Sequence, residues 1–260
     1  MIGAIIGDIV GSRFEFNNIK TNDFTLITDE SRFTDDTVLT IAVMEWILSS
    51  EIKNKYNVTP YLQKWAKKYP NAGYGGMFSK WIYLDNPSPY NSCGNGSAMR
   101  VSACGWAAES MIDATTLAYY ATNVTHNHPE GLKGAYVTAE LIYMARSGKS
   151  KEEMKEYASQ YYDLNLDYEE LKKTYRHGPE ICQVTLPQAL YCFFISKDFE
   201  DCLRTTISIG GDYDTTAAIS CAIAEAYYKN IPTSLIIDVY KKLPKEMIDI
   251  IERFNSVYNK

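Results

Sequence analysis

The stretch that decides the fold is Thr34-Asp35-Asp36-Thr37-Val38-Leu39-Thr40-Ile41-Ala42-Val43-Met44-Glu45-Trp46-Ile47-Leu48. Two acidic residues precede a run of apolar residues. Wound into a helix of 3.6 residues per turn, this run would have apolar side chains on nearly every face, so the pattern predicts a buried, central helix over 37–49. Strand-like alternation is scarce elsewhere in the chain. We therefore expect an all-α fold in which helices pack on helices.

Further stretches show the helical period. The helix expected over 215–229 carries several small side chains, among them Ala217, Ala218 and Ser220, which allow a neighbouring helix to approach closely. We expect it to pack against the helix over 37–49, which would bring the starts of both helices to one end of the core. The other helices are expected over 59–68, 114–122, 131–147, 151–161, 186–194, 198–209 and 234–258.

A second acidic cluster, Asp212-Tyr213-Asp214-Thr215, stands before the helix over 215–229, about 180 residues after the first cluster. The four aspartates of the two clusters would balance two divalent cations, and hard ions such as Mg²⁺ prefer oxygen ligands. The alternative is that each cluster only caps its helix, because Thr and Asp oxygens accept from the free amides of a first turn. The pairing of the clusters favours a metal site without deciding between the two interpretations.

Composition and net charge restrict the classes to which this protein could belong. The 260 residues are 46% hydrophobic and contain no Gly/Ser/Pro-rich linker, so we expect one domain spanning 1–260. A net charge of −6 gives no general attraction to nucleic acid or to anionic membranes, although a local pocket could still hold phosphates. No stretch has the ~18–20 uninterrupted apolar residues of a membrane span.

Six cysteines lack CxxC spacing, and five of them lie among apolar or small residues, as buried thiols do. The apolar N-terminus lacks the basic region of a signal peptide and reaches an acid at Asp8. We therefore expect a cytoplasmic protein.

A glycine-rich segment, Gly94-Asn95-Gly96-Ser97-Ala98-Met99-Arg100, follows a Pro- and Asn-rich loop. Closely spaced glycines free backbone amides to face an anion, although an ordinary turn would use the same residues. Neither a Walker sequence nor a dinucleotide fingerprint is present. Arg100 is either a phosphate ligand or an ion-pair partner in the core.

Two other features contain titratable side chains. His126 and His128 lie in one loop, but no third nitrogen or sulfur ligand stands at zinc spacing, so we expect a hydrogen-bonding or plain loop role. Glu15 lies between Phe14 and Phe16. An acid there has a raised pKa and acts as a base, or else faces solvent while the rings face the core.

Taken in order, these motifs resemble those of the ADP-ribosylglycohydrolase family, which includes the dinitrogenase-reductase-activating glycohydrolases and the ADP-ribosyl-acceptor hydrolases. The resemblance covers nearly the whole chain. It is carried by Gly3-Ala4-Ile5-Ile6-Gly7-Asp8 running to Glu15, Phe33-Thr34-Asp35-Asp36-Thr37, Gly94 to Arg100, Thr125-His126, and Ile209-Gly210-Gly211-Asp212-Tyr213-Asp214-Thr215.

The resemblance implies a compact, orthogonal multi-helix fold and two Mg²⁺ (or Mn²⁺) ions. It assigns Glu15, Asp35 and Asp214 to catalysis. The implied metal ligands are Thr34, Asp35, Asp36, Asp212, Asp214 and Thr215. The implied contacts to ADP-ribose are Ser92, Gly94, Asn95, Gly96 and His126, with Gly75 and Gly76 less secure.

The implied activity is hydrolysis of the glycosidic bond between ADP-ribose and a modified protein side chain or a related conjugate. The alternative is a reader that binds ADP-ribose without turnover. Tyr213 departs from the family pattern, where a small residue is common, and we expect its phenol to narrow the metal site or change the leaving group that fits. The sequence does not name the acceptor. We expect the chain to act as a monomer.

Overall fold

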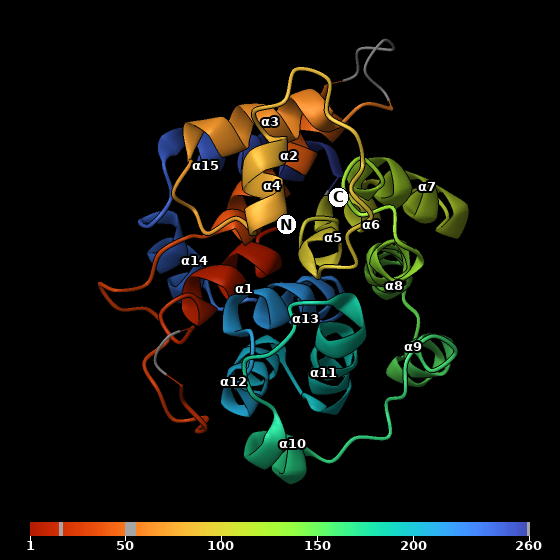
Figure 1. The fold of residues 1–260 in the computed structure, drawn as a ribbon. Coiled ribbons are helices and arrows are strands. Elements are labelled where there is room, and N and C mark those ends of the chain that lie inside the picture. Colours follow the sequence, from red (N-terminus) through yellow and green to blue (C-terminus); the bar gives the residue numbers. More distant parts are fainter. Residues whose placement is uncertain (16–17, 50–55, 259–260) are drawn as a thin grey trace.

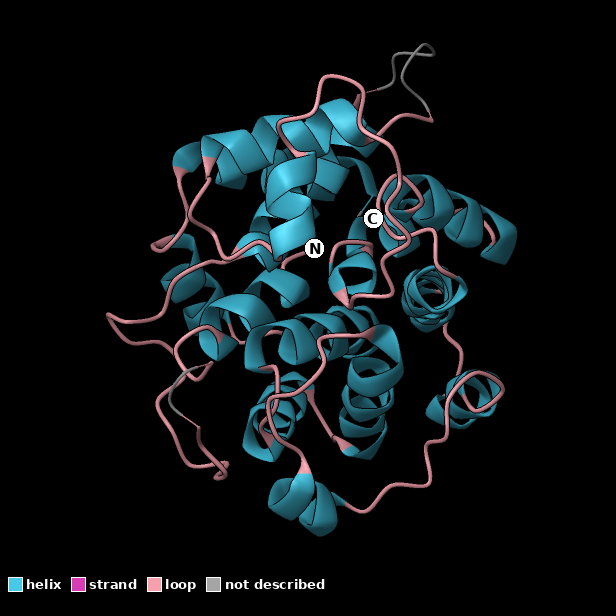
Figure 2. Cartoon of the chain, viewed as in Figure 1, coloured by secondary structure: helices cyan, strands magenta, loops and turns pink. Residues whose placement is uncertain are grey.

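The computed structural model describes residues 1–15, 18–49 and 56–258. Over these residues the chain forms fifteen helices and no strand (Figures 1 and 2), and the only extended pairing is an isolated antiparallel bridge between Gly94 and Ile181. The prediction of an all-α fold is confirmed. The helices are α1 (Gly3–Gly11), α2 (Asp35–Leu48), α3 (Thr59–Lys68), α4 (Gly76–Trp81), α5 (Gly96–Met99), α6 (Ser102–Ala107), α7 (Met111–Thr122), α8 (Pro129–Arg146), α9 (Lys151–Ala158), α10 (Tyr168–Thr174), α11 (Cys182–Ile195), α12 (Phe199–Ile209), α13 (Tyr213–Tyr228), α14 (Thr233–Tyr240) and α15 (Lys245–Tyr258).

Most predicted helices lie within a few residues of the observed ones, and α3 has the predicted bounds. The single helix expected over 234–258 is wrong, because α14 ends at Tyr240 and α15 begins at Lys245. Pro244 accounts for the break: it has no amide hydrogen to donate and it disfavours the helical conformation of Leu243. Helix α1 and the short helices α4, α5, α6 and α10 were not predicted from the sequence.

Helix α1 packs against α13 through three glycines spaced four residues apart (Figure 1). A Cβ atom built on Gly7 would lie 2.3 Å from the carbonyl oxygen of Ala217, and one on Gly3 or Gly11 would meet the α13 backbone at 2.4–2.6 Å. We expected the small residues of α13 to face α2, and that prediction is wrong, since α1 takes the closest approach.

The starts of α2 and α13 nevertheless meet, as expected. The Thr215 hydroxyl donates to Asp36 Oδ2 at 3.0 Å, which joins the two acidic clusters directly. Helix α2 is buried at 10 of its 14 positions and α13 at 14 of its 16, so both form the centre of the molecule.

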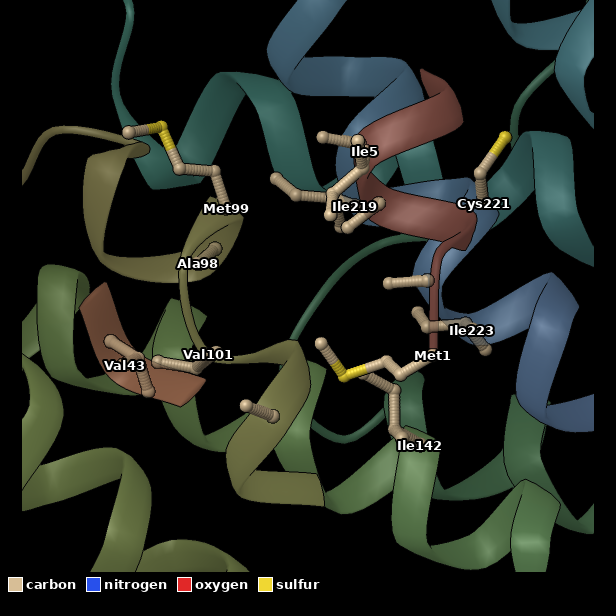
Figure 3. Packing of buried hydrophobic residues seen from close by; sticks show 14 of the residues in the cluster. Met1, Ile5, Val43, Ala98, Met99, Val101, Ile142, Ile219, Cys221 and Ile223 are labelled. Carbon is tan, nitrogen blue, oxygen red and sulfur yellow. The ribbon is translucent and has the colours of Figure 1, made fainter. Parts of the chain in front are cut away.

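Most of the core is one large cluster of buried apolar side chains drawn from nearly all parts of the chain, and Leu171, Cys192 and Ile209 form a second, small cluster. Figure 3 shows Ile5 of α1, Ile219 and Ile223 of α13, Ile142 of α8 and Val43 of α2 in this cluster. Burial of such surfaces stabilises the fold by about 25 cal/mol per Å² of apolar area removed from water. The core therefore anchors α2 and α13, the two helices that begin at the acidic clusters.

All six cysteines are free thiols, and five of them are buried. Along the described ranges, every helix is too short or too polar to span a membrane. The cytoplasmic location remains a prediction.

Candidate active site

A cavity of about 530 Å³ opens where α2 and α13 begin. It is large enough for a ligand of nucleotide size, since small-molecule sites typically measure about 300–1,000 Å³. Thr34 is the one predicted site residue that does not line it. The predicted residues on its wall are Glu15, Asp35, Asp36, Gly75, Gly76, Ser92, Gly94, Asn95, Gly96, His126, Asp212, Asp214 and Thr215.

Asp8 anchors the start of α2 from behind the cavity wall. This carboxylate is fully buried and accepts hydrogen bonds from the backbone amides of Thr34 (2.9 Å) and Thr37 (3.1 Å) and from both of their hydroxyl groups. Burial, and then the charge of Asp214, raise the pKa of Asp8 to about 7. This role of Asp8 was not predicted, although an acid inside an apolar, glycine-rich segment was a signal for one.

Thr34 serves the helix more than the cavity. Its hydroxyl donates to Asp8 Oδ1 at 2.7 Å and accepts from the amide of Asp36, which makes Thr34 the N-cap of α2. The capping interpretation therefore holds for this residue, whereas the aspartates beside it face the cavity.

The charge of Asp214 acts on acidic side chains from several parts of the chain. Burial, and then the charge of Asp214, raise the pKa values of Asp35, Asp36, Asp212 and Glu15. The same neighbour influences acids from three separate stretches of sequence, so these stretches share one site. Carboxylates crowded in this way are costly to keep ionised unless cations compensate them.

The donor set fits hard divalent ions. Asp36 Oδ1 is buried and has no hydrogen-bond partner among residues 1–15, 18–49 and 56–258, while Oδ2 accepts from Thr215. Within the same ranges, no three His, Cys, Asp or Glu side chains form a cage that could hold an ion unaided. Hydroxyl, water or substrate oxygens would complete the coordination, which suits Mg²⁺ because that ion usually retains several waters.

Asn95 connects the glycine-rich segment to the second acidic cluster. Its side-chain amide donates to Asp212 Oδ2 at 2.6 Å and to the Thr185 hydroxyl at 3.0 Å. Both amide hydrogens are thus used inside the protein. Asn95 positions Asp212, a role that sequence reasoning did not find.

The backbone of the glycine-rich segment is less free than we expected. The amide of Gly94 donates to the Ser92 hydroxyl at 3.0 Å, and the amide of Asn95 donates to the carbonyl of Glu180 at 3.0 Å. The prediction of several free amides is wrong for these two positions. An anion over this segment would therefore depend on side-chain donors as well.

His126 supplies such a side chain. It lies on the cavity wall with its Nε2 edge against the glycines, so that a Cβ atom built on Gly94 or Gly96 would lie 3.4 or 3.3 Å from Nε2. Burial, and then the charge of Arg100, hold the pKa of His126 well below its usual range. His128 instead caps α8 by accepting from the Glu130 amide, so the two histidines do not converge on one ion.

Arg100 is fully buried and forms no ion pair with any residue the structure describes. The interpretation of Arg100 as an ion-pair partner in the core is therefore wrong. Burial lowers its pKa to about 10. The group remains a cation beside the cavity at neutral pH.

Glu15 lies on the cavity wall, partly exposed. Phe14 points into the core, where its ring packs against Phe24 at 5.3 Å and Tyr213 at 5.9 Å; Phe16 lies outside the described residues. The raised pKa and the wall position favour a role in proton transfer over a purely solvent-facing one.

Tyr213 does not narrow the cavity. Its side chain is fully buried away from the cavity wall, and its hydroxyl accepts from the Ile19 amide at 2.9 Å and lies 3.1 Å from Asn18 Oδ1. The expectation that the phenol narrows the metal site is wrong, because the first turn of α13 directs Asp212 and Asp214 to the cavity and Tyr213 to the segment around Ile19.

Gly75 and Gly76 also line the cavity, at the start of α4. A Cβ atom built on either would meet nothing within 4 Å. These glycines border open space, so they do not provide the close backbone approach seen between α1 and α13.

Fold and cavity together define an all-α protein with a nucleotide-sized pocket that contains crowded carboxylates on one side and a buried arginine and histidine on the other. The sequence pattern of the ADP-ribosylglycohydrolase family matches residues 1–259. The chain belongs to the ADP-ribosylglycohydrolase family and is a hydrolase of that family.

Relatives agree with this assignment. The chain is 28% identical to the human ADP-ribosylhydrolase ARH3, over 88% of this chain and 84% of that protein. It is 22% identical to the ADP-ribosyl-[dinitrogen reductase] glycohydrolase of Rhodospirillum rubrum, over 95% and 90% of the two chains. A solved structure described as an ADP-ribosylglycohydrolase-related protein complex has a TM-score of 0.69 at 22% identity, covering 96% of this chain and 93% of that one, and shows the same fold.

Proposed function

We propose that the protein is a metal-dependent hydrolase that removes ADP-ribose from a modified acceptor, either a protein side chain or a related conjugate. The observation that carries the proposal is the convergence of Asp35, Asp36, Asp212 and Asp214 in one cavity, with Asp36 Oδ1 buried and unpartnered in the described ranges. Such a site has a deficit of positive charge.

The acidic clusters would hold two Mg²⁺ or Mn²⁺ ions, with Asp35 and Asp36 on one side and Asp212, Asp214 and Thr215 on the other. Bound ions would supply fixation of the ribose hydroxyls and orientation of the attacking water. Asp8 and Asn95 keep the two sets of carboxylates in place through the hydrogen bonds described above.

The bond to be cleaved joins C1 of the ribose to nitrogen or oxygen, and its cleavage develops positive charge at C1. Glu15, on the wall near Asp214, would transfer a proton to or from the water or the leaving group, and burial and the charge of Asp214 raise its pKa in the direction that favours holding a proton. The aspartates would be engaged with cations, so the usual two-carboxylate glycosidase scheme need not apply.

We further propose a cytoplasmic location, where the six free thiols would stay reduced, and a monomeric state. Neither bears on the chemistry of the cavity.

The test is a panel of defined substrates carrying ADP-ribose on arginine, serine, a nucleic-acid base or a small molecule, assayed by chromatography for released ADP-ribose. Each substrate is incubated with Mg²⁺ and with a chelator. We expect release only with the metal. If the protein binds these substrates but releases ADP-ribose from none of them, it is a reader of ADP-ribose and not a hydrolase. Release that is unaffected by the chelator would contradict metal dependence.

A further inference from the structure

Arg100, Thr125 and His126 form a buried hydrogen-bonded group at the edge of the cavity. Arg100 Nη2 donates to the Thr125 hydroxyl at 2.6 Å and lies 3.2 Å from His126 Nδ1, while the Thr125 hydroxyl is 2.7 Å from the same nitrogen. Arg100 Nε and Nη1 are buried and have no hydrogen-bond partner over the described residues. This arrangement is expensive as plain core packing, because a buried cation without an acid costs several kcal/mol.

The chemistry of these groups selects one tautomer of His126. A guanidinium has donors only, so it can approach Nδ1 favourably only when Nδ1 is an acceptor. A hydrogen on Nδ1 would face the Arg100 N–H groups, donor against donor. Arg100 also donates to Thr125, whose own hydroxyl hydrogen has two acceptors in reach: Nδ1 at 2.7 Å and the carbonyl oxygen of Thr122 at 3.3 Å. The ring proton is then on Nε2.

Nε2 is the edge of the ring that faces the cavity. It lies against Gly94 and Gly96, and no side chain or backbone atom of the described residues forms a hydrogen bond with it. Two of the nearby amides, those of Gly94 and Asn95, already donate inside the protein. An Nε2–H group would thus be an available donor at the place where the backbone offers few.

We propose that Arg100 is a positioning residue that fixes His126 in the Nε2–H tautomer, so that Nε2–H donates to a phosphate oxygen of the nucleotide lying over Gly94–Gly96. The identity of this ligand rests on the proposed function, whereas the tautomer does not. Arg100 acts through His126 and Thr125 and adds a buried positive charge near the phosphates.

The most direct test is to determine the tautomer of His126 by NMR. The protein is labelled with ¹⁵N-histidine, and two-bond ¹H–¹⁵N correlation spectra are recorded without ADP-ribose. Only three histidines are present in the chain, and His128→Gln and His177→Gln assign the signals. We expect the Nε2–H pattern for His126 in the wild type. A wild-type Nδ1–H pattern, or a doubly protonated ring at neutral pH, would overturn the proposal without any variant having to fold.

Variants test the role of Arg100. Arg100→Met should give a mixed or Nδ1–H pattern, and Arg100→Lys, which retains a donor, should restore part of the Nε2–H population. Thr125→Val, which keeps Arg100 facing Nδ1, should retain the Nε2–H pattern. If Arg100→Met folds and His126 keeps the Nε2–H tautomer, Arg100 does not fix the tautomer and the proposal is contradicted.

Binding separates this proposal from the proposed function. Arg100→Met should bind ADP-ribose about 10- to 100-fold more weakly, the scale of a lost hydrogen bond to a charged group, while its affinity for adenosine, which has no phosphate, should change less than about threefold. Equal losses for both ligands would indicate general distortion and contradict the proposal. A wild type with the Nε2–H tautomer that binds no ADP-ribose would instead contradict the proposed function.

Discussion

The cavity has two sides with buried charges of opposite sign, and the described residues form no ion pair between these sides. The acidic side consists of Asp35, Asp36, Asp212 and Asp214 at the starts of α2 and α13, and the histidine side consists of Gly94, Gly96, Arg100 and His126. Each side has buried atoms without a hydrogen-bond partner among the described residues: Asp36 Oδ1 on the acidic side, and Nε and Nη1 of Arg100 on the histidine side. Because unpaired buried charge is costly, each side is best explained by a ligand of the opposite sign.

The two sides also differ in how they are supported. Asp8 and Asn95 hold the acidic side through hydrogen bonds to α2 and to Asp212, and α1 brings Asp8 there through its glycine contacts with α13. Arg100 and Thr125 support the histidine side. Changes on one side should therefore alter one kind of binding and spare the other, which gives the following predictions.

Asp214→Asn should have the largest effect. Turnover should fall by about 10³-fold, because the loss of a metal contribution of several kcal/mol corresponds to that factor. In a chelator the variant should unfold at a higher temperature than the wild type, since Asp214 contributes to the raised pKa values of Asp35, Asp36 and Asp212. Asp85→Asn, which changes an exposed acid, is the control for both assays. Turnover of Asp214→Asn within tenfold of the wild type would contradict the proposed role of Asp214 as a metal ligand.

Glu15→Gln should reduce turnover by roughly 10²-fold or more, the usual scale for a lost acid–base group. The amide keeps the size and much of the hydrogen bonding of Glu15, so the affinity for ADP-ribose and the metal content should change little. Steady-state kinetics and equilibrium titration separate the two effects. Near-normal turnover of Glu15→Gln would contradict a role in proton transfer and indicate that Glu15 only faces solvent. Loss of bound metal in this variant would indicate that Glu15 belongs to the metal site.

Gly7→Ala should lower the free energy of unfolding by about 2–3 kcal/mol, because the added Cβ atom would meet the Ala217 backbone at 2.3 Å. This loss should outweigh the gain of about 1 kcal/mol in helix propensity. The matched control is Gly76→Ala, also in a helix, where the Cβ atom meets nothing within 4 Å. Denaturant unfolding of both variants checks the prediction, and equal stabilities would contradict the close α1–α13 contact.

Tyr213→Phe should have the smallest effect. Loss of the hydroxyl, which pairs with Ile19 and Asn18, should cost about 1 kcal/mol of stability and leave turnover within about twofold. Thermal unfolding measures the change in stability, and the panel of ADP-ribosylated substrates measures turnover. A marked change in acceptor preference would mean that the phenol does reach the leaving group.

Local patterns explain what the sequence could predict. The apolar run of α2 and the small residues of α13 are visible within one window, and so are the Thr and Asp residues that begin both helices. Helix α1 was not assigned because Gly3, Gly7 and Gly11 are poor helix formers, and only contact with α13 compensates for them.

Long-range partners explain the rest. Asp8 bonds to Thr34, 26 residues away, and Asn95 bonds to Asp212, 117 residues away, so neither role is visible in a local pattern. Small residues on α13 indicated a close neighbour without indicating which helix it was. The resemblance to a family of known enzymes named the residues of the cavity, and the structure added the residues that hold them.

Counting the divalent ions bound by the wild type tests the central claim most directly. Metal-free protein is titrated with Mg²⁺ and with Mn²⁺ in a calorimeter, and bound metal is quantified after dialysis. We expect two ions per chain, with the count reduced in Asp35→Ala and Asp214→Ala and unchanged in Arg100→Met. A wild type that binds neither Mg²⁺ nor Mn²⁺ would contradict the assignment of the acidic side to a metal site.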